Sequence, residues 1–544
     1  MNKILNELKN YKYIYVALLT VIILGSFLRL YNLGENSFVA DEFLDVNATY
    51  GYHKLGEWQA WDFNHNQESV RDNKLSDKRA WVYRWQVSQL YKFKYFPPTE
   101  FTIRLVSALW GIFTIAILYF VTLSFTKNRW IALISAFLWA TSVPAIEINR
   151  KIRMYSMFAP IFLILSWTIF QFIEISKQKT KTLFKSFFNF RWVYLLPVLF
   201  FGLLAAHLHQ LTGNITLAIF VYCLIRFFVE YRKKNKLNRY IFYVTGMIFV
   251  IVIFSIAAKT QFEWLKKTLV FFEDHWNYFN HIGLNYGNAV VGWFLMFMGS
   301  WYLMRKKEIS KSGLWIFLNF MAILLAAVFV WARNVGPQYI FFIQSFGLIL
   351  TASGIFVLAK FIVETISSRS IKIFSKKIKL NEKQWMSIIV GIFLILTLNV
   401  SYFFQENNTY HLTSSSDTPN YRKVFDYVKR NYQKGDVMIT RNFRNYYYNK
   451  LDIPVFDFGS ERSVEDIEKE GKVHKITLEY VKEIVSENPS GWVVFSDNDR
   501  DFITKEAREY FDDNFEKVTD SSLVRGRISV YRWIQNNMDK KLEI

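Results

Sequence analysis

Residues 14–31 read IYVALLTVIILGSFLRLY, and residues 36–46, only a few positions later, read NSFVADEFLDV. Arg29 is the single charged residue of the first stretch. A helix of about 17 to 25 mostly apolar residues crosses a bilayer, because backbone polar groups in hydrocarbon must be satisfied within their own segment. The first stretch therefore predicts a membrane span with carboxylates directly beyond its end.

The same pattern recurs along most of the chain. We predict a polytopic α-helical membrane protein with about eleven transmembrane helices. The spans are expected at about residues 14–31, 102–125, 130–147, 154–174, 191–208, 212–229, 239–258, 289–304, 314–331, 338–363 and 385–404. The composition agrees, since 52% of the 544 residues are hydrophobic and 19% are aromatic, which favours membrane spans over several soluble domains.

The net charge of +21 lies mainly in alternate loops. Lys and Arg crowd the segments 176–191, 230–239 and 367–383, among others, which is the asymmetry expected of cytoplasmic loops. We therefore expect a multi-pass plasma-membrane protein with a cytoplasmic N-terminus. The basic excess belongs to these loops and gives no reason to expect nucleic acid as a partner. The lone Cys223 excludes an intramolecular disulfide.

Two domains are expected. Residues 1–404 would form the membrane domain, with a first external loop at 32–100. Because an odd number of spans precedes them, residues 405–544 would lie on the extracytoplasmic side with this first loop. Helical and extended stretches alternate in 405–544, which favours a C-terminal α/β domain with a partly parallel sheet. In the first loop, helical spacing groups Trp81 with Trp85, as in a helix lying in the headgroup layer.

Polar side chains at the outer ends of spans are the candidates for chemistry, because charge near hydrocarbon is costly and usually tied to function or to lipid headgroups. Asp41, Glu42 and Asp45 follow the first span. Other candidates at predicted outer ends are Arg104, Glu147, Arg150, Lys151, Arg153, Tyr155, His207, His209, Arg333 and Tyr339.

One reaction suits such a set of side chains: attack by a hydroxyl or amine on a sugar carried by a lipid phosphate. The leaving phosphate is already acidic and needs a cation to hold its charge rather than a general acid. The nucleophile needs the opposite, a carboxylate that takes its proton as the new bond forms. A carboxylate just past a span would lie at the depth of a lipid-borne phosphate.

The motifs resemble those of integral-membrane glycosyltransferases of the GT-C fold, in particular glycosyltransferase family 39. This protein O-mannosyltransferase-like family includes the bacterial aminoarabinose transferase that acts on lipid A. The resemblance spans roughly residues 10–360. The tail of this chain after residue 405 does not resemble the β-trefoil of the eukaryotic O-mannosyltransferases. It rests on ADEFLD, FTIRLVSALWGIFTI, NRKIRMYSM, HLHQLTGN and GPQYI, which occur in this order at outer span ends.

The resemblance implies an inverting transferase that takes a monosaccharide from a polyprenyl-phosphate donor. By residue, it implies Asp41 as the base, Glu42 as its orienting partner, and Arg104 and Arg153 as cations for the donor phosphate. We expect weaker phosphate contacts from Arg150 and Arg333, and substrate contacts from Tyr155, His209 and Tyr339. Membrane lipids would surround the protein, and the acceptor, a protein hydroxyl, a lipid or a glycan of the cell envelope, stays open.

Plainer interpretations of these residues exist. Asp41 and Glu42 could cap a short helix, whose N-terminus favours negative charge. Asp45 is more naturally solvated or structural. Arg104 and Arg153 could extend toward ordinary lipid headgroups.

Other functions are also open. An oligosaccharyltransferase shares the architecture but would carry a WWDYG-like motif in the tail, and a transporter or flippase for lipid-linked sugars would place its charges mid-span. Asp497 and Asp499 have the spacing of a metal–nucleotide-sugar motif, although a polar turn explains them. We expect no cofactor, although a divalent metal between Asp41 and Glu147 is conceivable.

Overall fold

A computed structural model describes most of the chain, and the statements below concern the residues it describes. These are 12–69, 77–93, 98–174, 191–232, 240–241, 243–249, 275–331, 336–368, 382–440, 448, 450, 453–457, 476–520 and 522–535.

The chain forms two compact units. The helical unit comprises residues 1–30, 107–150 and 154–404, and the mixed unit comprises 31–106, 151–153 and 405–544. The last boundary of this division falls between residues 404 and 405, and two earlier segments, 31–106 and 151–153, group with the tail.

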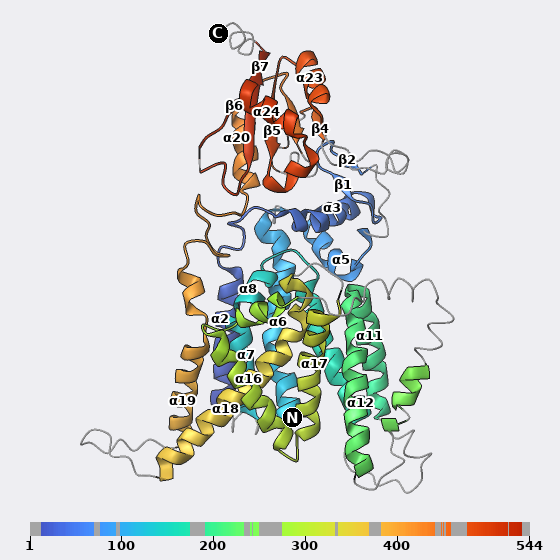
Figure 1. Ribbon diagram of the computed structural model, residues 1–544, viewed down its shortest axis with the longest axis vertical. Helices are drawn as coiled ribbons and strands as arrows, with labels where there is room; N and C mark the ends of the chain where they lie inside the picture. Colours follow the sequence, from blue (N-terminus) through green and yellow to red (C-terminus); the bar gives the residue numbers. More distant parts are fainter. Residues whose placement is uncertain are drawn as a thin grey trace, which may run out of the picture. The chain divides into compact units, whose positions relative to one another are not determined.

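The helical unit is built mainly from apolar helices (Figure 1). Helix α16 packs along α18, and α12 packs along α17. The helices are α2 (Lys12–Leu30), α6 (Glu100–Thr126, whose first residues belong to the mixed unit), α7 (Arg129–Thr141), α8 (Val143–Asn149), α9 (Tyr155–Ile173), α11 (Leu195–Leu208), α12 (Asn214–Arg232), α15 (Asn277–Gly283), α16 (Ala289–Arg305), α17 (Ser310–Phe329), α18 (Gln344–Ser368) and α19 (Glu382–Thr397).

In the described part of the chain, six of these helical segments are long and apolar enough to cross a membrane, or seven when the bent pair α7 and α8 counts as one span. They are Lys12–Leu30, Glu100–Thr126, Tyr155–Ile173, Gln210–Arg232, Ser310–Phe329 and Phe341–Ile366. The protein is therefore a mostly helical, multi-pass membrane protein.

The predicted number of eleven spans is not confirmed. The stretches expected at 191–208 and 385–404 contain shorter apolar helices, Trp192–Leu208 and Gln384–Thr397. Helix α16 has only 17 residues. Most of the span expected at 239–258 lies outside the described residues.

The break between α7 and α8 has a local cause. Ser142 ends α7 with extended backbone, and its hydroxyl accepts a hydrogen bond from the N–H of Ala145 in the first turn of α8, where Pro144 also lies. Serine and proline favour a helix start. The two helices consequently meet at a bend of 58°.

Arg29 fastens α2 to this bent pair. It is fully buried, and its guanidinium donates to Asn149 Oδ1 at 3.0 Å and to the carbonyls of Ala140 at 3.0 Å and Trp139 at 3.1 Å. A Cβ at Gly111 of α6 would collide with Asn149 and Arg29. Glycine thus leaves room for a buried cation whose hydrogen bonds offset its desolvation.

The mixed unit contains the first loop. Its elements there are α3 (Ala40–Leu55), the antiparallel pair β1 (Trp61–Asp62) and β2 (Gln67–Glu68), and α5 (Trp81–Leu90). Helix α3 ends at Gly56, whose φ of 77° is left-handed and suits glycine. Helix α5 packs on α3 through its buried face, while Trp81 and Trp85 are exposed on the other side.

The rest of the mixed unit is a five-stranded sheet with helices on both faces. Its strand order is β4-β3-β5-β7-β6, where β3 is parallel to β4 and β5, and β7 is antiparallel to β5 and β6. The strands are β3 (Val437–Thr440), β4 (Val455–Asp457), β5 (Ser490–Phe495), β6 (Glu516–Lys517) and β7 (Ser529–Ile534), and the helices are α20 (Tyr421–Asn431), α23 (Leu478–Glu487) and α24 (Lys505–Asn514).

Alternating residues of each strand serve the two faces of this sheet. Trp492 of β5 packs with Phe425 of α20, whereas the next residue, Val493, packs with Ile484 of α23 and Phe511 of α24. This alternation is the period of two expected of a strand covered on both faces.

Candidate functional site

The candidate site lies in the mixed unit, at the start of α3. The helix begins at Ala40, and the backbone N–H of Val39 donates to Glu42 Oε2 at 3.0 Å. Glu42 thereby satisfies an N–H at the helix start, the role expected of an acidic residue in the first turn.

Glu42 is almost completely buried, at 1% exposed, and accepts four hydrogen bonds. Oε1 accepts from Arg104 Nε at 2.8 Å and from the N–H of Ile152 at 3.0 Å. Oε2 accepts from Arg104 Nη2 at 2.7 Å as well as from Val39. Burial raises the pKa of Glu42, but the charge and hydrogen bonds of Arg104 and the two backbone N–H groups lower this pKa below its ordinary value overall.

A carboxylate offers about four lone-pair positions, and all of those on Glu42 are occupied. Glu42 is therefore held as an anion that is poorly placed to accept a proton from a substrate. It instead ties α3 to α6 through Arg104 and to the 151–153 segment through Ile152.

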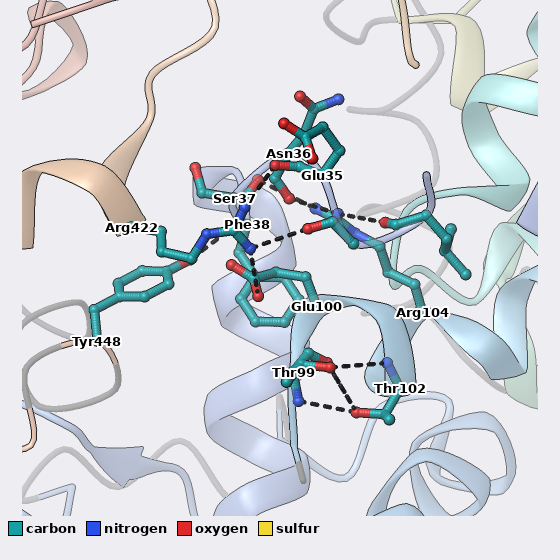
Figure 2. Close-up of polar contacts among 12 residues, drawn as sticks. Glu35, Asn36, Ser37, Phe38, Thr99, Glu100, Thr102, Arg104, Arg422 and Tyr448 are labelled. Atoms are coloured by element: carbon teal, nitrogen blue, oxygen red, sulfur yellow. Dashed lines mark hydrogen bonds and ion pairs between the residues drawn. The ribbon is translucent and has the colours of Figure 1, made fainter. Parts of the chain in front are cut away.

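Arg104 has an equally complete set of partners. Besides Glu42, Nη1 donates to the carbonyls of Leu33 at 3.1 Å and Asn36 at 2.7 Å, and Nη2 donates to the carbonyl of Ser37 at 3.1 Å (Figure 2). These bonds use the five N–H donors of a guanidinium, and the residue is 4% exposed. In this structure Arg104 has no donor left for a lipid phosphate, which argues against the phosphate-binding role expected from the resemblance.

Asp45, one turn further along α3, holds two other arginines. It is 1% exposed; Oδ1 accepts from Arg84 Nε at 2.8 Å and Oδ2 accepts from Arg153 Nη1 at 3.0 Å. Sequence reasoning treated Asp45 as solvated or structural and did not single out Arg84. The i, i+3 spacing of Glu42 and Asp45, which places both on one helix face, was the signal that could have linked them.

Asp41 differs from Glu42 and Asp45 because its side chain is exposed. Its backbone carbonyl accepts from Arg153 Nη1 at 3.0 Å, so Arg153 is held between Asp41 and Asp45. The side chain of Arg153 is 19% exposed, against 5% for that of Arg104. Lys151, two residues before Arg153, is exposed as well. The mixed unit thus places a partly accessible guanidinium against the backbone of a residue whose side chain is exposed.

Three predicted substrate-binding residues meet in the helical unit. The ring of Tyr155 lies 5.3 Å from that of His209 and 6.4 Å from that of Tyr339, measured between centroids. His209 is 2% exposed, and its Nδ1 accepts from the N–H of Leu211 at 3.1 Å. Tyr155 therefore lies next to both His209 and Tyr339, and contact of these residues with substrate remains a prediction.

The other predicted residues have different surroundings. Arg150 is 4% exposed and donates from Nη1 to the carbonyl of Arg29 at 3.1 Å. Arg333 lies outside the described residues. Glu147 accepts from the hydroxyl of Tyr402 at 2.9 Å. Among the described residues, no group of three or more His, Cys, Asp and Glu side chains is placed to hold a metal ion.

No protein-family model and no curated protein sequence matches the chain. Solved structures do match it. ArnT from Cupriavidus metallidurans superimposes with a TM-score of 0.55 in the apo state and 0.57 when bound to undecaprenyl phosphate, in each case at 10% identity over 96% of this chain and 98% of that one. The archaeal oligosaccharyltransferase AglB from Archaeoglobus fulgidus, in complex with an inhibitory peptide and a dolichol-phosphate, matches with a TM-score of 0.55 at 10% identity over 95% of this chain and 74% of that one.

Identities this low establish the architecture and not the activity. The likeness nevertheless extends over nearly the whole of this chain in both comparisons, and over 98% of ArnT and 74% of AglB. The chain therefore has the GT-C fold that its span-end motifs predicted.

Proposed function

We propose that the protein is an inverting glycosyltransferase that moves a monosaccharide from a polyprenyl-phosphate donor to an acceptor outside the cytoplasm. The observation that carries the proposal is the start of α3, where the exposed Asp41 directly precedes a saturated, buried ion pair and shares Arg153 with Asp45. The fold supports the donor class, since the crystal structure of ArnT holds undecaprenyl phosphate and the AglB structure is a complex with a dolichol-phosphate.

In the proposed reaction, Asp41 accepts the proton of an acceptor hydroxyl or amine while that oxygen or nitrogen attacks the anomeric carbon. The bond between this carbon and the phosphate oxygen breaks on the opposite face, so the configuration inverts. Polyprenyl phosphate leaves as an anion, and the cations of the 151–153 segment, Arg153 and Lys151, stabilise its charge. The proton then passes from Asp41 to water.

The buried pair has a different task. Glu42 and Arg104 fix the first turn of α3 against α6 and the 151–153 segment, so the base and the phosphate-binding cations keep their separation. Alignment of reacting groups supplies much of the barrier reduction in such displacements. We thus assign Glu42 and Arg104 as positioning residues, and Asp41 as the group that reacts.

The remaining assignments are part of the same proposal. Tyr155, His209 and Tyr339 are the candidates for contact with the sugar or the lipid, since aromatic rings and imidazole suit sugar faces and hydroxyls. By the positive-inside argument, the N-terminus is cytoplasmic and residues 405–544, with the active site, face the other side.

The proposal can be tested without knowing the acceptor, because every productive turnover releases polyprenyl phosphate. Purified protein in lipid nanodiscs would be incubated with a panel of radiolabelled polyprenyl-phosphate monosaccharides and with extracted cell-envelope material, and lipid phosphate release would be measured. Asp41→Asn should reduce release by about 10²- to 10⁴-fold. Asp417→Asn is the matched control, since that carboxylate is 91% exposed in the tail.

Near-normal release by Asp41→Asn would refute the assigned base. In sealed proteoliposomes, movement of intact donor across the bilayer without release would instead indicate a flippase. Transfer of a preassembled oligosaccharide in place of a monosaccharide would indicate an oligosaccharyltransferase. The chemistry as written calls for no metal, so we expect activity to survive a chelator, and loss that Mn²⁺ or Mg²⁺ restores would contradict this part of the proposal.

A further inference from the structure

The short segment 33–38 lies within the connection between the end of α2 at Leu30 and the start of α3 at Ala40. Its own backbone forms no helix or strand, so its conformation depends on side chains that bind it. Arg104 takes the carbonyls of Leu33, Asn36 and Ser37, as described above. The carbonyls of Gly34 and Glu35, which lie between those of Leu33 and Asn36, accept hydrogen bonds from a different residue.

Those two carbonyls bind Arg422, a residue of α20 in the C-terminal tail. Arg422 Nη1 donates to the carbonyl of Gly34 at 3.0 Å, and Nη2 donates to that of Glu35 at 2.7 Å. Arg422 Nη1 also lies 3.1 Å from Glu100 Oε2 (Figure 2). Glu100 is 4% exposed and is the first residue of α6. One guanidinium from the tail therefore joins the segment 33–38 to the start of α6.

Further bonds from the tail reach the same segment. The N–H of Phe38 donates to Tyr448 Oη at 3.1 Å (Figure 2). Ser37 Oγ donates to the carbonyl of Pro419 at 3.1 Å, and Asn36 Nδ2 donates to that of Thr409 at 3.1 Å. Burial raises the pKa of Tyr448 well above its ordinary value, so the phenol stays neutral as it accepts this bond.

Two cations thus hold the entry to α3 from different parts of the chain. Glu100 and Arg104 lie one turn apart on α6; Glu100 pairs with Arg422, and Arg104 pairs with Glu42. Asp41 follows the segment 33–38 by only three positions. Loss of the tail's bonds would loosen the segment that sets the position of Asp41, while the ion pair of Glu42 with Arg104 would remain.

We infer that the C-terminal tail acts as a clamp on the start of the catalytic helix and that Arg422 is its main positioning residue. The expected effect of Arg422 on kcat rests on the proposed function. The expected effect on the conformation of residues 33–38 rests on the hydrogen bonds alone. It gives residues 405–544 a role in the reaction that does not require them to touch the sugar or the acceptor.

The test replaces Arg422 with alanine in the full-length protein. We expect kcat for polyprenyl phosphate release to fall about tenfold or more, because small displacements of a catalytic group cost up to about 10²-fold, while KM for the donor changes less than about twofold. Arg430→Ala is the matched control: it removes the same charge from the same helix at an exposed position. Millimolar guanidinium should partly restore kcat in Arg422→Ala and not affect Arg430→Ala.

Hydrogen exchange detected by mass spectrometry separates this inference from the proposed function. In Arg422→Ala, amides of residues 33–42 should exchange faster while those of β5 (Ser490–Phe495) stay unchanged. Tyr448→Phe should accelerate exchange at Phe38, whose N–H loses its acceptor. These measurements need no substrate and stand if the wild-type protein releases no lipid phosphate.

The inference fails if Arg422→Ala matches Arg430→Ala in both kcat and exchange of residues 33–42. It also fails if exchange rises throughout the sheet and guanidinium restores nothing, because Arg422 would then support folding of the tail in general. Unchanged exchange in residues 33–42, even with lowered kcat, would likewise overturn the clamp.

Discussion

Asp41 and Glu42 are adjacent carboxylates that should respond oppositely to amide substitution. In Glu42→Gln, the new NH₂ group must face two N–H donors whichever way the amide turns, because each carboxylate oxygen accepts two bonds. Two of four hydrogen bonds are lost, and Arg104 remains buried without its counter-charge. Breaking a buried ion pair by removing one partner costs about 3 to 5 kcal/mol.

Asp41→Asn changes an exposed side chain, and such substitutions typically alter stability by less than about 0.5 kcal/mol. Thermal unfolding of both variants in the same detergent, followed by the fraction that stays monodisperse, should show a melting temperature lowered by roughly 3 to 5 °C for Glu42→Gln and unchanged for Asp41→Asn. Turnover should be lost in Asp41→Asn. If both variants melted like the wild type, or if Asp41→Asn melted like Glu42→Gln, the division of roles would be wrong.

Three further outcomes follow from the same contacts. Asp45→Asn should lower the free energy of unfolding by about 3 to 5 kcal/mol, because it leaves Arg84 buried without its carboxylate. Arg153→Gln, at a partly exposed site, should lower it by less than about 1 kcal/mol and mainly raise KM for the donor. Equal melting temperatures of the two variants would contradict this expectation. Because the pKa of Glu42 is lower in the folded protein than the ordinary 4.5, its ion pair stabilises fully above about pH 4.5 and is lost as pH falls through the folded pKa, so acidification should lower the melting temperature of the wild type more than that of Glu42→Gln. A fluorophore at Trp85→Cys, in a Cys223→Ser background, should be quenched by nitroxide lipids, and one at the exposed Lys482→Cys in the tail should not.

Much of the membrane architecture was predictable because apolar length is a local property. Stretches such as 14–31 and 314–331 became helices α2 and α17 within a few residues of the expected ends. The count of spans was less predictable. The stretch 130–147 has the apolar length of one span, but Ser142 and Pro144 divide it into two helices that meet at an angle. The apolar length of a stretch does not predict such a bend.

Expectations for the site fared unevenly for a physical reason. The span-end rule singled out Asp41, Glu42, Arg104 and Arg153 as candidates, because charge beside hydrocarbon is rare wherever it occurs. It could not assign donors to acceptors. Arg104 and Glu42 are 62 positions apart in the sequence, and Arg153 and Asp45 are 108 positions apart. Only the tertiary structure shows that all the N–H groups of the Arg104 guanidinium already donate hydrogen bonds within the protein.

The helix period explains why adjacent carboxylates differ. Successive residues of a helix point about 100° apart, so Asp41 and Glu42 cannot share surroundings, while Glu42 and Asp45 can. Along α3, Glu42, Asp45 and Thr49 are buried, and Asp41 and Leu44 are exposed. A hydrophobic-pattern rule predicts the exposed Asp41 correctly but inverts Leu44, Glu42 and Asp45, since it places leucine in the core and carboxylates in water. The inversion is stable only because arginines from α5, α6 and the 151–153 segment meet the buried carboxylates, and it leaves Asp41 as the carboxylate of this first turn that solvent, and hence a substrate, can reach.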